Sequence, residues 1–169
     1  DFLYGWYNAD PEQARFFASN NLACRRSSFH QLGGFDQLFR NAAAEDRDFC
    51  DRWRESGRRM VYVGNAIVRH LHRATLGQFV RQHATYGRGA VDLHEGRERR
   101  HVDRPRLEPI AFYYQLLTYP MWRGFGMRTP YLVVLAFVSQ AAYAWGYYSE
   151  RWTRRRGKQA VVDGAPAAE

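Results

Sequence analysis

The sequence predicts an α/β fold followed by apolar helices. Three observations lead to this prediction. Apolar stretches typical of strands, at residues 16–25, 59–64 and 66–73, alternate with segments that carry helix signals. A well-formed helix pattern begins near Glu45 and ends before Gly57. Beyond Pro109 the composition changes abruptly to long runs without charge.

The elements of the first hundred residues follow from local signals. Two serines can start a short helix at residues 27–34, and the glycine pair Gly33 and Gly34 can end it. The helix from Glu45 has acidic residues at its front, where they suit the helix dipole, and Gly57 can take the left-handed position after it. Residues 59–64 and 66–73 have hairpin-like spacing, which suits two strands or a strand and a loop.

The rest of the chain divides by composition. Residues 75–100 are compatible with a helix, broken by Gly87 and Gly89, and a linker rich in charge and proline follows. We expect a first domain at 1–105, an apolar helical segment at 106–152, and a disordered tail at 153–169 that is basic and then rich in Ala and Pro. The chain starts at Asp1 without a signal-peptide pattern, which suggests an internal cut.

The formal net charge of +8 at pH 7 is compatible with binding to nucleic acid or to an anionic membrane. However, Lys158 is the only lysine, the arginines are interspersed with acids, and the sequence has no zinc pattern or alternating aromatic and basic stripe. We therefore expect no nucleic acid. Cys24 and Cys50 form no CxxC pair, which favours a reducing, cytoplasmic compartment.

One carboxylate lies on the unexpected side of the predicted helix. At 100° per residue, Phe49, Cys50 and Trp53 share a stripe, and Asp46 falls in its middle, whereas Asp48 and Asp51 fall elsewhere. A carboxylate on the buried side is costly unless it is hydrogen-bonded or paired. Asp46 is therefore either a helix-capping aspartate or a general base in a cleft, and spacing alone does not choose between them.

Residues 16–73 carry a linked series of motifs: an Asn-bearing segment, a GGFD turn, an ED pair that opens a helix, and apolar segments that end in histidine. Together they resemble the second half of a family-2 inverting glycosyltransferase. The resemblance extends over roughly residues 16–90. It implies the C-terminal half of a GT-A, Rossmann-like domain that uses a nucleotide-sugar donor.

The resemblance also implies roles for particular residues. Asp46 matches the general base, which removes the acceptor hydroxyl proton during a single inverting displacement, and Glu45 matches its acidic neighbour. A divalent cation, Mn or Mg, would neutralise the leaving diphosphate, with His70 as a metal ligand and His72 as the alternate. Either histidine could equally be an ordinary solvated residue at a strand end.

Three further residues are candidates for substrate binding. Asn20 and Asn21 could hydrogen-bond sugar hydroxyls, although polar residues that close a strand are common. Arg88, between two glycines, could grip a phosphate, although a surface arginine in a broken helix is the commoner case.

Two departures from the family pattern limit the activity that we expect. No upstream half with an Asp-x-Asp metal motif precedes Phe16, so we expect the isolated chain to be inactive. Gln78 and Arg81 are followed by Gln82, where processive members carry tryptophan, so we favour transfer of a single sugar.

The apolar end suggests membrane association. Residues 129–149 are uncharged and long enough to span a bilayer, and aromatic residues lie toward both ends of the run. Because sugar nucleotides and the basic tail both favour the cytoplasmic side, we expect a re-entrant hairpin or two interfacial helices at the cytoplasmic face of the cell membrane. Core helices of a soluble protein are the alternative.

The sequence thus predicts a glycosyltransferase fragment. In the intact enzyme it would transfer one sugar from a nucleotide-sugar donor to an acceptor hydroxyl, with inversion, at the membrane surface. The acceptor would be lipid-linked or a carbohydrate. The alternative is a non-catalytic, membrane-associated interaction module derived from such an enzyme.

Overall fold

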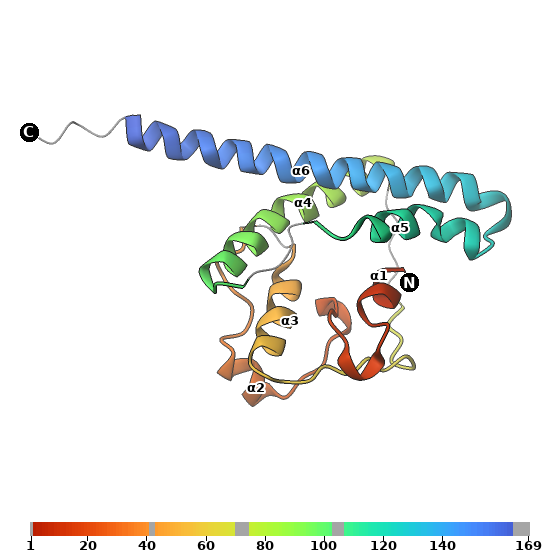
Figure 1. Cartoon of the computed structure of the whole chain (residues 1–169), viewed down its shortest axis with the longest axis horizontal. Helices are drawn as coiled ribbons and strands as arrows, with labels where there is room; N and C mark the ends of the chain where they lie inside the picture. The colour runs from red at the N-terminus through yellow and green to blue at the C-terminus, as the bar shows by residue number, and fades with distance from the viewer. Residues whose placement is uncertain (1, 41–42, 70–74, 103–106, 164–169) are drawn as a thin grey trace, which may run out of the picture.

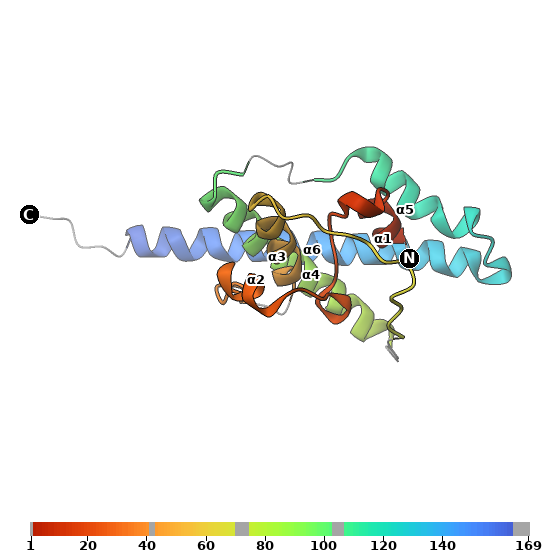
Figure 2. The same cartoon turned by 90° about the horizontal axis from the view of Figure 1, so that it is seen from below.

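Two long helices form the frame of the molecule. The computed structural model describes residues 2–40, 43–69, 75–102 and 107–163. The helices α4 (Leu76–Arg99) and α6 (Thr129–Asp163) pack along each other, and α5 (Ile110–Trp122) folds back against the first part of α6 (Figures 1 and 2). The shorter helices lie on the other side of α4 and α5: α1 (Phe2–Tyr7), α2 (Arg26–Gln31) and α3 (Glu45–Glu55). Single 3-10 turns occupy Pro11–Gln13, Ser19–Asn21 and Gly126–Arg128.

The bounds of the short helices follow the local signals. Glu45, Asp46 and Asp48 lie in the first turn of α3, where they suit the helix dipole. Gly57 follows α3 with φ of +77°, the left-handed conformation that glycine adopts without strain. Gly33 and Gly34 end α2 in the same way, with φ of +78° and +67°. The predicted helices at these two places are therefore confirmed.

The helix α4 is continuous through the glycines that were expected to break it. A capping box between Thr75 and Gln78 starts it. Gly87 and Gly89 are buried within it, because a Cβ at Gly87 would overlap the backbone of Tyr143 on α6, and one at Gly89 would overlap Ala43. Gly146 of α6 is in equally close contact with the backbone of Ala84. The glycines allow two backbones to approach, so the prediction of a broken helix was wrong.

The described residues contain no strand, so the predicted α/β, Rossmann-like fold is wrong for this chain. A strand needs a neighbour to satisfy its backbone groups. The extended segment around Phe16 obtains these hydrogen bonds from side chains instead. Asn8 Oδ1 accepts from the amides of Arg15 and Phe16, and Asn8 Nδ2 donates to the Phe16 carbonyl. The next two amides donate to Cys50 Sγ and to the Tyr4 hydroxyl.

The segment at 58–63 is extended as well, but it is not part of a ladder. Only isolated backbone bonds join it to the N-terminal segment among the described residues: the amide of Ala14 donates to the Met60 carbonyl and that of Tyr62 to Pro11. Ala14, Met60 and Cys50 of α3 form a small buried core, against which Phe16, Phe17, Leu22, Trp53 and Tyr62 pack. Packing of aromatic side chains on α3 thus takes the place of the expected sheet.

The prediction of apolar membrane helices after the first domain is also overturned. Residues 110–122 and 129–149 are helical, as expected, but no helix in the described part of the chain is long and apolar enough to cross a membrane. One face of α6 packs on α4 and carries polar groups. There Arg154 forms ion pairs with Asp92 at 2.7 Å and Glu95 at 2.8 Å on α4, and with Glu150 at 2.8 Å on α6 itself. The helix continues to Asp163, into the segment predicted to be a tail.

Candidate functional site

The two candidate catalytic carboxylates open α3. Asp46 is half-buried, and its Oδ2 accepts a hydrogen bond from the amide of Ser19 at 3.2 Å, while Oδ1 accepts from the Arg47 amide at 2.8 Å. The residue that caps the helix is Ala44, so Asp46 lies inside the first turn and not at the capping position. Its carboxylate therefore joins α3 to the 3-10 turn Ser19–Asn21.

The environment makes both carboxylates more basic than usual. Burial raises the pKa of Asp46, against the opposing effect of the backbone hydrogen bonds from Ser19 and Arg47. Burial also raises the pKa of Glu45, and the neighbouring negative charge of Asp46 adds to this rise. The buried Oε2 of Glu45 accepts no hydrogen bond from any described residue. Raised carboxyl pKa values are typical of groups that exchange protons near neutral pH.

The backbone just before this pair is in an unusual conformation. Ala44 has φ of +71° and ψ of 0°, in the left-handed region that residues with a Cβ rarely adopt. Its carbonyl accepts the amide of Asp48 at 2.9 Å, which begins the helical hydrogen bonding. Such local strain clusters at functional sites. Ala44 directly precedes the Glu45 and Asp46 pair.

The arginine after the pair ties α3 to the N-terminal aromatic residues. The Arg47 guanidinium carbon lies 4.5 Å from the centre of the Tyr7 ring and 4.8 Å from that of Phe16. Its Nη1 donates to the Tyr7 hydroxyl at 3.1 Å, and that hydroxyl donates to Glu108 at 2.7 Å. Burial raises the pKa of Tyr7 to about 12, so its hydroxyl keeps its proton at neutral pH. This network holds the first turn of α3 in place from its other side.

The remaining candidate residues are dispersed. Asn20 and Asn21 are both exposed in the turn next to Asp46, and Asn21 Nδ2 donates to the Ala66 carbonyl at 2.9 Å. Arg88 lies in the middle of α4, where its guanidinium donates to Thr85 Oγ1 at 2.9 Å. Among the described residues, Arg88 makes no hydrogen bond or ion pair with Glu45 or Asp46. His70 and its alternate His72 lie outside the described residues.

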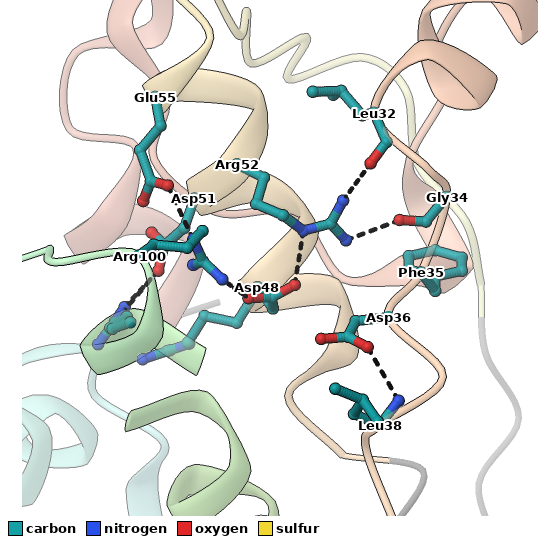
Figure 3. A network of polar contacts seen from close by, with 12 residues as sticks. Leu32, Gly34, Phe35, Asp36, Leu38, Asp48, Asp51, Arg52, Glu55 and Arg100 are labelled. Atoms are coloured by element: carbon teal, nitrogen blue, oxygen red, sulfur yellow. Dashed lines mark hydrogen bonds and ion pairs between the residues drawn. The ribbon is translucent and has the colours of Figure 1, made fainter. Parts of the chain in front are cut away.

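Two other aspartates of α3 are buried far more deeply than Asp46. The side chain of Asp48 is 0% exposed and is paired on both sides, with Arg52 at 2.7 Å and with Arg100 at 2.8 Å (Figure 3). Asp51, 3% exposed, pairs with Arg97 at 2.7 Å. The apolar stripe predicted for this helix placed Asp48 and Asp51 outside the buried face. The end of α4 packs on the side of α3 that carries these two aspartates, and the helical pattern alone could not show this contact. Arg97 and Arg100 were the only signal for this interface.

The same network secures the turn of the GGFD motif. Besides binding Asp48, the Arg52 guanidinium donates to the carbonyls of Leu32 at 2.7 Å and Gly34 at 2.6 Å (Figure 3). In the same turn, Asp36 Oδ1 accepts the amide of Leu38 at 2.9 Å. The motif thus positions α2 against α3, as turn chemistry would predict, and among the described residues it makes no hydrogen bond with Asp46.

A cation site does not emerge from the residues that the structure describes. No group of three or more His, Cys, Asp or Glu side chains is arranged among them to hold a metal ion. Glu45 and Asp46 are a pair, and the deeper carboxylates are neutralised by arginines. The candidate ligands His70 and His72 lie outside the described residues, so the divalent cation stays a prediction.

Comparison with known proteins finds a partial similarity to glycosyltransferases. The chain is 36% identical over 78 residues to the pre-mycofactocin glycosyltransferases of two strains of Mycobacterium tuberculosis, CDC 1551 / Oshkosh and ATCC 25618 / H37Rv. The match covers 46% of this chain and 16% of each relative, so the chain spans only about a sixth of their length. No family model and no solved structure matches. The similarity supports a relationship between this chain and glycosyltransferases.

Proposed function

We propose that this chain supplies the acceptor-activating part of an inverting, family-2-type glycosyltransferase, with Asp46 as the general base. One observation carries the proposal: the half-buried carboxylate of Asp46, with its pKa raised by burial, is held by the backbone amide of Ser19, two residues after the left-handed Ala44. The similarity to glycosyltransferases supplies the class of reaction.

The proposed chemistry is a single displacement. Asp46 accepts the proton of an acceptor hydroxyl while that oxygen forms a bond to the anomeric carbon of the donor sugar. The bond between the anomeric carbon and the donor phosphate oxygen breaks at the same time, and the nucleoside diphosphate leaves with the electron pair. Attack from the opposite face inverts the anomeric centre. No step of this proposal passes through a cation.

Glu45 has a supporting role in this proposal. Its buried Oε2, without a partner among the described contacts, can accept a hydrogen bond from an acceptor group and so orient it toward Asp46. Because the chain corresponds to only 16% of the relatives' length, we expect donor binding to require further residues and the isolated chain to be inactive. Single-sugar transfer and the cytoplasmic location stay predictions.

The substitution Asp46→Asn tests the base. In the complete transferase that carries this segment, we expect kcat to fall on the order of 10²–10⁴-fold with an unchanged KM for the donor, because the amide keeps the shape but cannot accept the proton. Glu45→Gln should cause a smaller loss. The measurements are steady-state kinetics and thermal unfolding.

A matched control separates catalysis from local structure. Asp10 is an exposed aspartate that also accepts a backbone amide, that of Glu12 at 3.0 Å, so Asp10→Asn makes the same chemical change away from α3. It should leave kcat and Tm unchanged. A purely structural Asp46 would instead lower Tm with near-normal turnover at low temperature. Normal turnover in Asp46→Asn would leave the chain as a non-catalytic module derived from such an enzyme.

A further inference from the structure

A cavity of about 970 Å³ lies between α1, the segment 62–68 and α5. This volume lies in the range of small-molecule sites. Its walls carry aromatic side chains that are each half-buried, so that each keeps part of its surface toward the opening. These side chains are Phe2, Tyr4, Trp6, Tyr62 and Tyr119.

The rings are held in a fixed arrangement by contacts with one another. Tyr4 and Tyr62 are stacked, with ring centres 6.3 Å apart and planes at 26°. Phe2 contacts Trp6 on its own helix and the edge of Tyr119 on α5, with a distance of 5.4 Å between the ring centres of Phe2 and Tyr119. Rings that already pack on one another lose little conformational entropy when a ligand covers them. The cleft is therefore largely preformed.

Polar groups lie among the aromatic rings. Asn21, Gln115, Arg15 and Arg123 line the same cavity, and all four are exposed. Amides both donate and accept hydrogen bonds, and the guanidinium groups donate several in one plane. Apolar ring faces bordered by such groups complement a pyranose ring, which has a face of C–H bonds and a rim of hydroxyls. The negative face of an aromatic ring attracts those C–H groups.

The cleft and Asp46 are attached to neighbouring backbone amides. The Tyr4 hydroxyl accepts the amide of Ala18 at 3.2 Å, and Asp46 Oδ2 accepts the next amide, that of Ser19, also at 3.2 Å. Since consecutive amide nitrogens are less than about 4 Å apart, the two oxygens lie within roughly 10 Å of each other. A ligand of two or more rings could thus occupy the cleft and still extend to the carboxylate.

We infer that this cleft binds the acceptor, and that the acceptor is an uncharged saccharide of at least two rings. The inference rests on the proposed function. Charges of both signs border the cleft, the guanidinium groups of Arg15 and Arg123 and the carboxylate of Glu108, so a nucleoside diphosphate is the competing ligand that the experiment must exclude.

Ligand-observed NMR tests this inference with the chain as it is. Saturation-transfer experiments with cellobiose and maltose should show transfer to the sugar C–H protons for at least one of the two. Tyr119→Leu should weaken that binding about 3- to 10-fold, because it removes one ring face while keeping an apolar side chain. The matched control is Tyr114→Leu, the same change on the same helix at a 63% exposed residue outside the cleft, which should not alter binding.

A further variant tests the cleft without relying on Tyr119→Leu. Gln115→Ala, at an exposed position, should weaken binding even if Tyr119→Leu fails to fold. The two assignments fail separately: the base is tested by the kcat of Asp46→Asn in the complete transferase, whereas the cleft is tested by disaccharide binding to Tyr119→Leu and Gln115→Ala, in which Asp46 is unchanged. The inference is overturned if neither disaccharide binds, if Tyr114→Leu weakens binding as much as Tyr119→Leu, or if UDP displaces the bound disaccharide.

Discussion

Asp48 and Arg52 lie one turn apart on α3, and their ion pair at 2.7 Å joins three parts of the molecule. The carboxylate also binds Arg100 at 2.8 Å, and the guanidinium also binds the loop after α2. Removing one partner of a buried pair leaves an uncompensated charge. The buried pair therefore connects α2, α3 and the end of α4 more strongly than an exposed ion pair would.

From this we expect Asp48→Asn to be strongly destabilising. The neutral side chain leaves the half-buried Arg52 without its counter-ion and leaves Arg100 with Glu55 alone, a loss of about 3–5 kcal/mol in the free energy of unfolding. The control is Glu12→Gln, which breaks an ion pair with Arg59 at 3.4 Å whose side chains are 65% and 70% exposed, and which should cost less than about 1 kcal/mol. Urea unfolding measures both values. Equal effects would show that the buried network does not hold α2 and α4 on α3.

The crossing of α4 and α6 gives a second prediction. In Gly87→Ala the new methyl group overlaps the backbone of Tyr143, so the helices must separate and stability should fall by several kcal/mol. Gly77→Ala is the matched control on α4, because the nearest atom to its new methyl group is the end of Arg81 at 3.7 Å. It should raise stability by up to about 1 kcal/mol through helix propensity. Stabilisation by both substitutions would contradict the observed crossing.

The raised carboxyl pKa values predict how stability depends on pH. Because the pKa of Asp46 is higher in the folded than in the unfolded chain, the folded state holds more protons above the ordinary value of 3.8, and the same holds for Glu45 above 4.5. Their contribution to stability is thus complete below these values and is lost as pH rises through the folded pKa. Thermal unfolding of the chain between pH 3.5 and pH 7, compared with Glu45→Gln/Asp46→Asn, should show this loss only in the unsubstituted chain. A relative gain with rising pH would contradict the assignment.

The two thiols should differ in reactivity. Burial raises the pKa of Cys50 to about 12, and its sulfur accepts the amide of Phe17 at 3.4 Å, whereas Cys24 is exposed. Because the thiolate is the reactive form, a disulfide reagent at pH 8 should label Cys24 quickly and Cys50 only after unfolding. Absorbance of the released thiol measures the two rates. The substitution Cys24→Ser should remove the fast phase, and a fast phase that persists would place Cys50 at the surface.

Part of the structure could be read from local sequence. Glycines after α2 and α3 adopt left-handed conformations that few other residues accept, so the ends of these helices were predictable. The uncharged runs at 110–122 and 129–149 were also expected to be helical, and both are helices in the structure. The ED pair was also identifiable, because its position in the first turn of a helix follows from the pattern alone.

The strands and the buried face of α3 could not be read in this way. Apolar, β-branched residues such as Val61 and Val63 favour extended backbone, but a sheet requires a second strand beside the first, and here Val61 and Val63 are 40% and 57% exposed. The helical stripe likewise omitted Asp48, because its partners Arg52 and Arg100 are brought together only when α4 packs on α3.

The sequence by itself determined the helix ends, the acidic opening of α3 and the similarity to glycosyltransferases, because each depends on residues close together in the chain. Tertiary structure alone decided that Gly87 of α4 packs against α6, that the Asp48 carboxylate is fully buried, and that Tyr4 and Asp46 bind consecutive amides. These relationships join residues far apart in sequence. The free energy of each of these contacts depends on which surfaces of the folded chain meet, and a local sequence pattern does not contain that information.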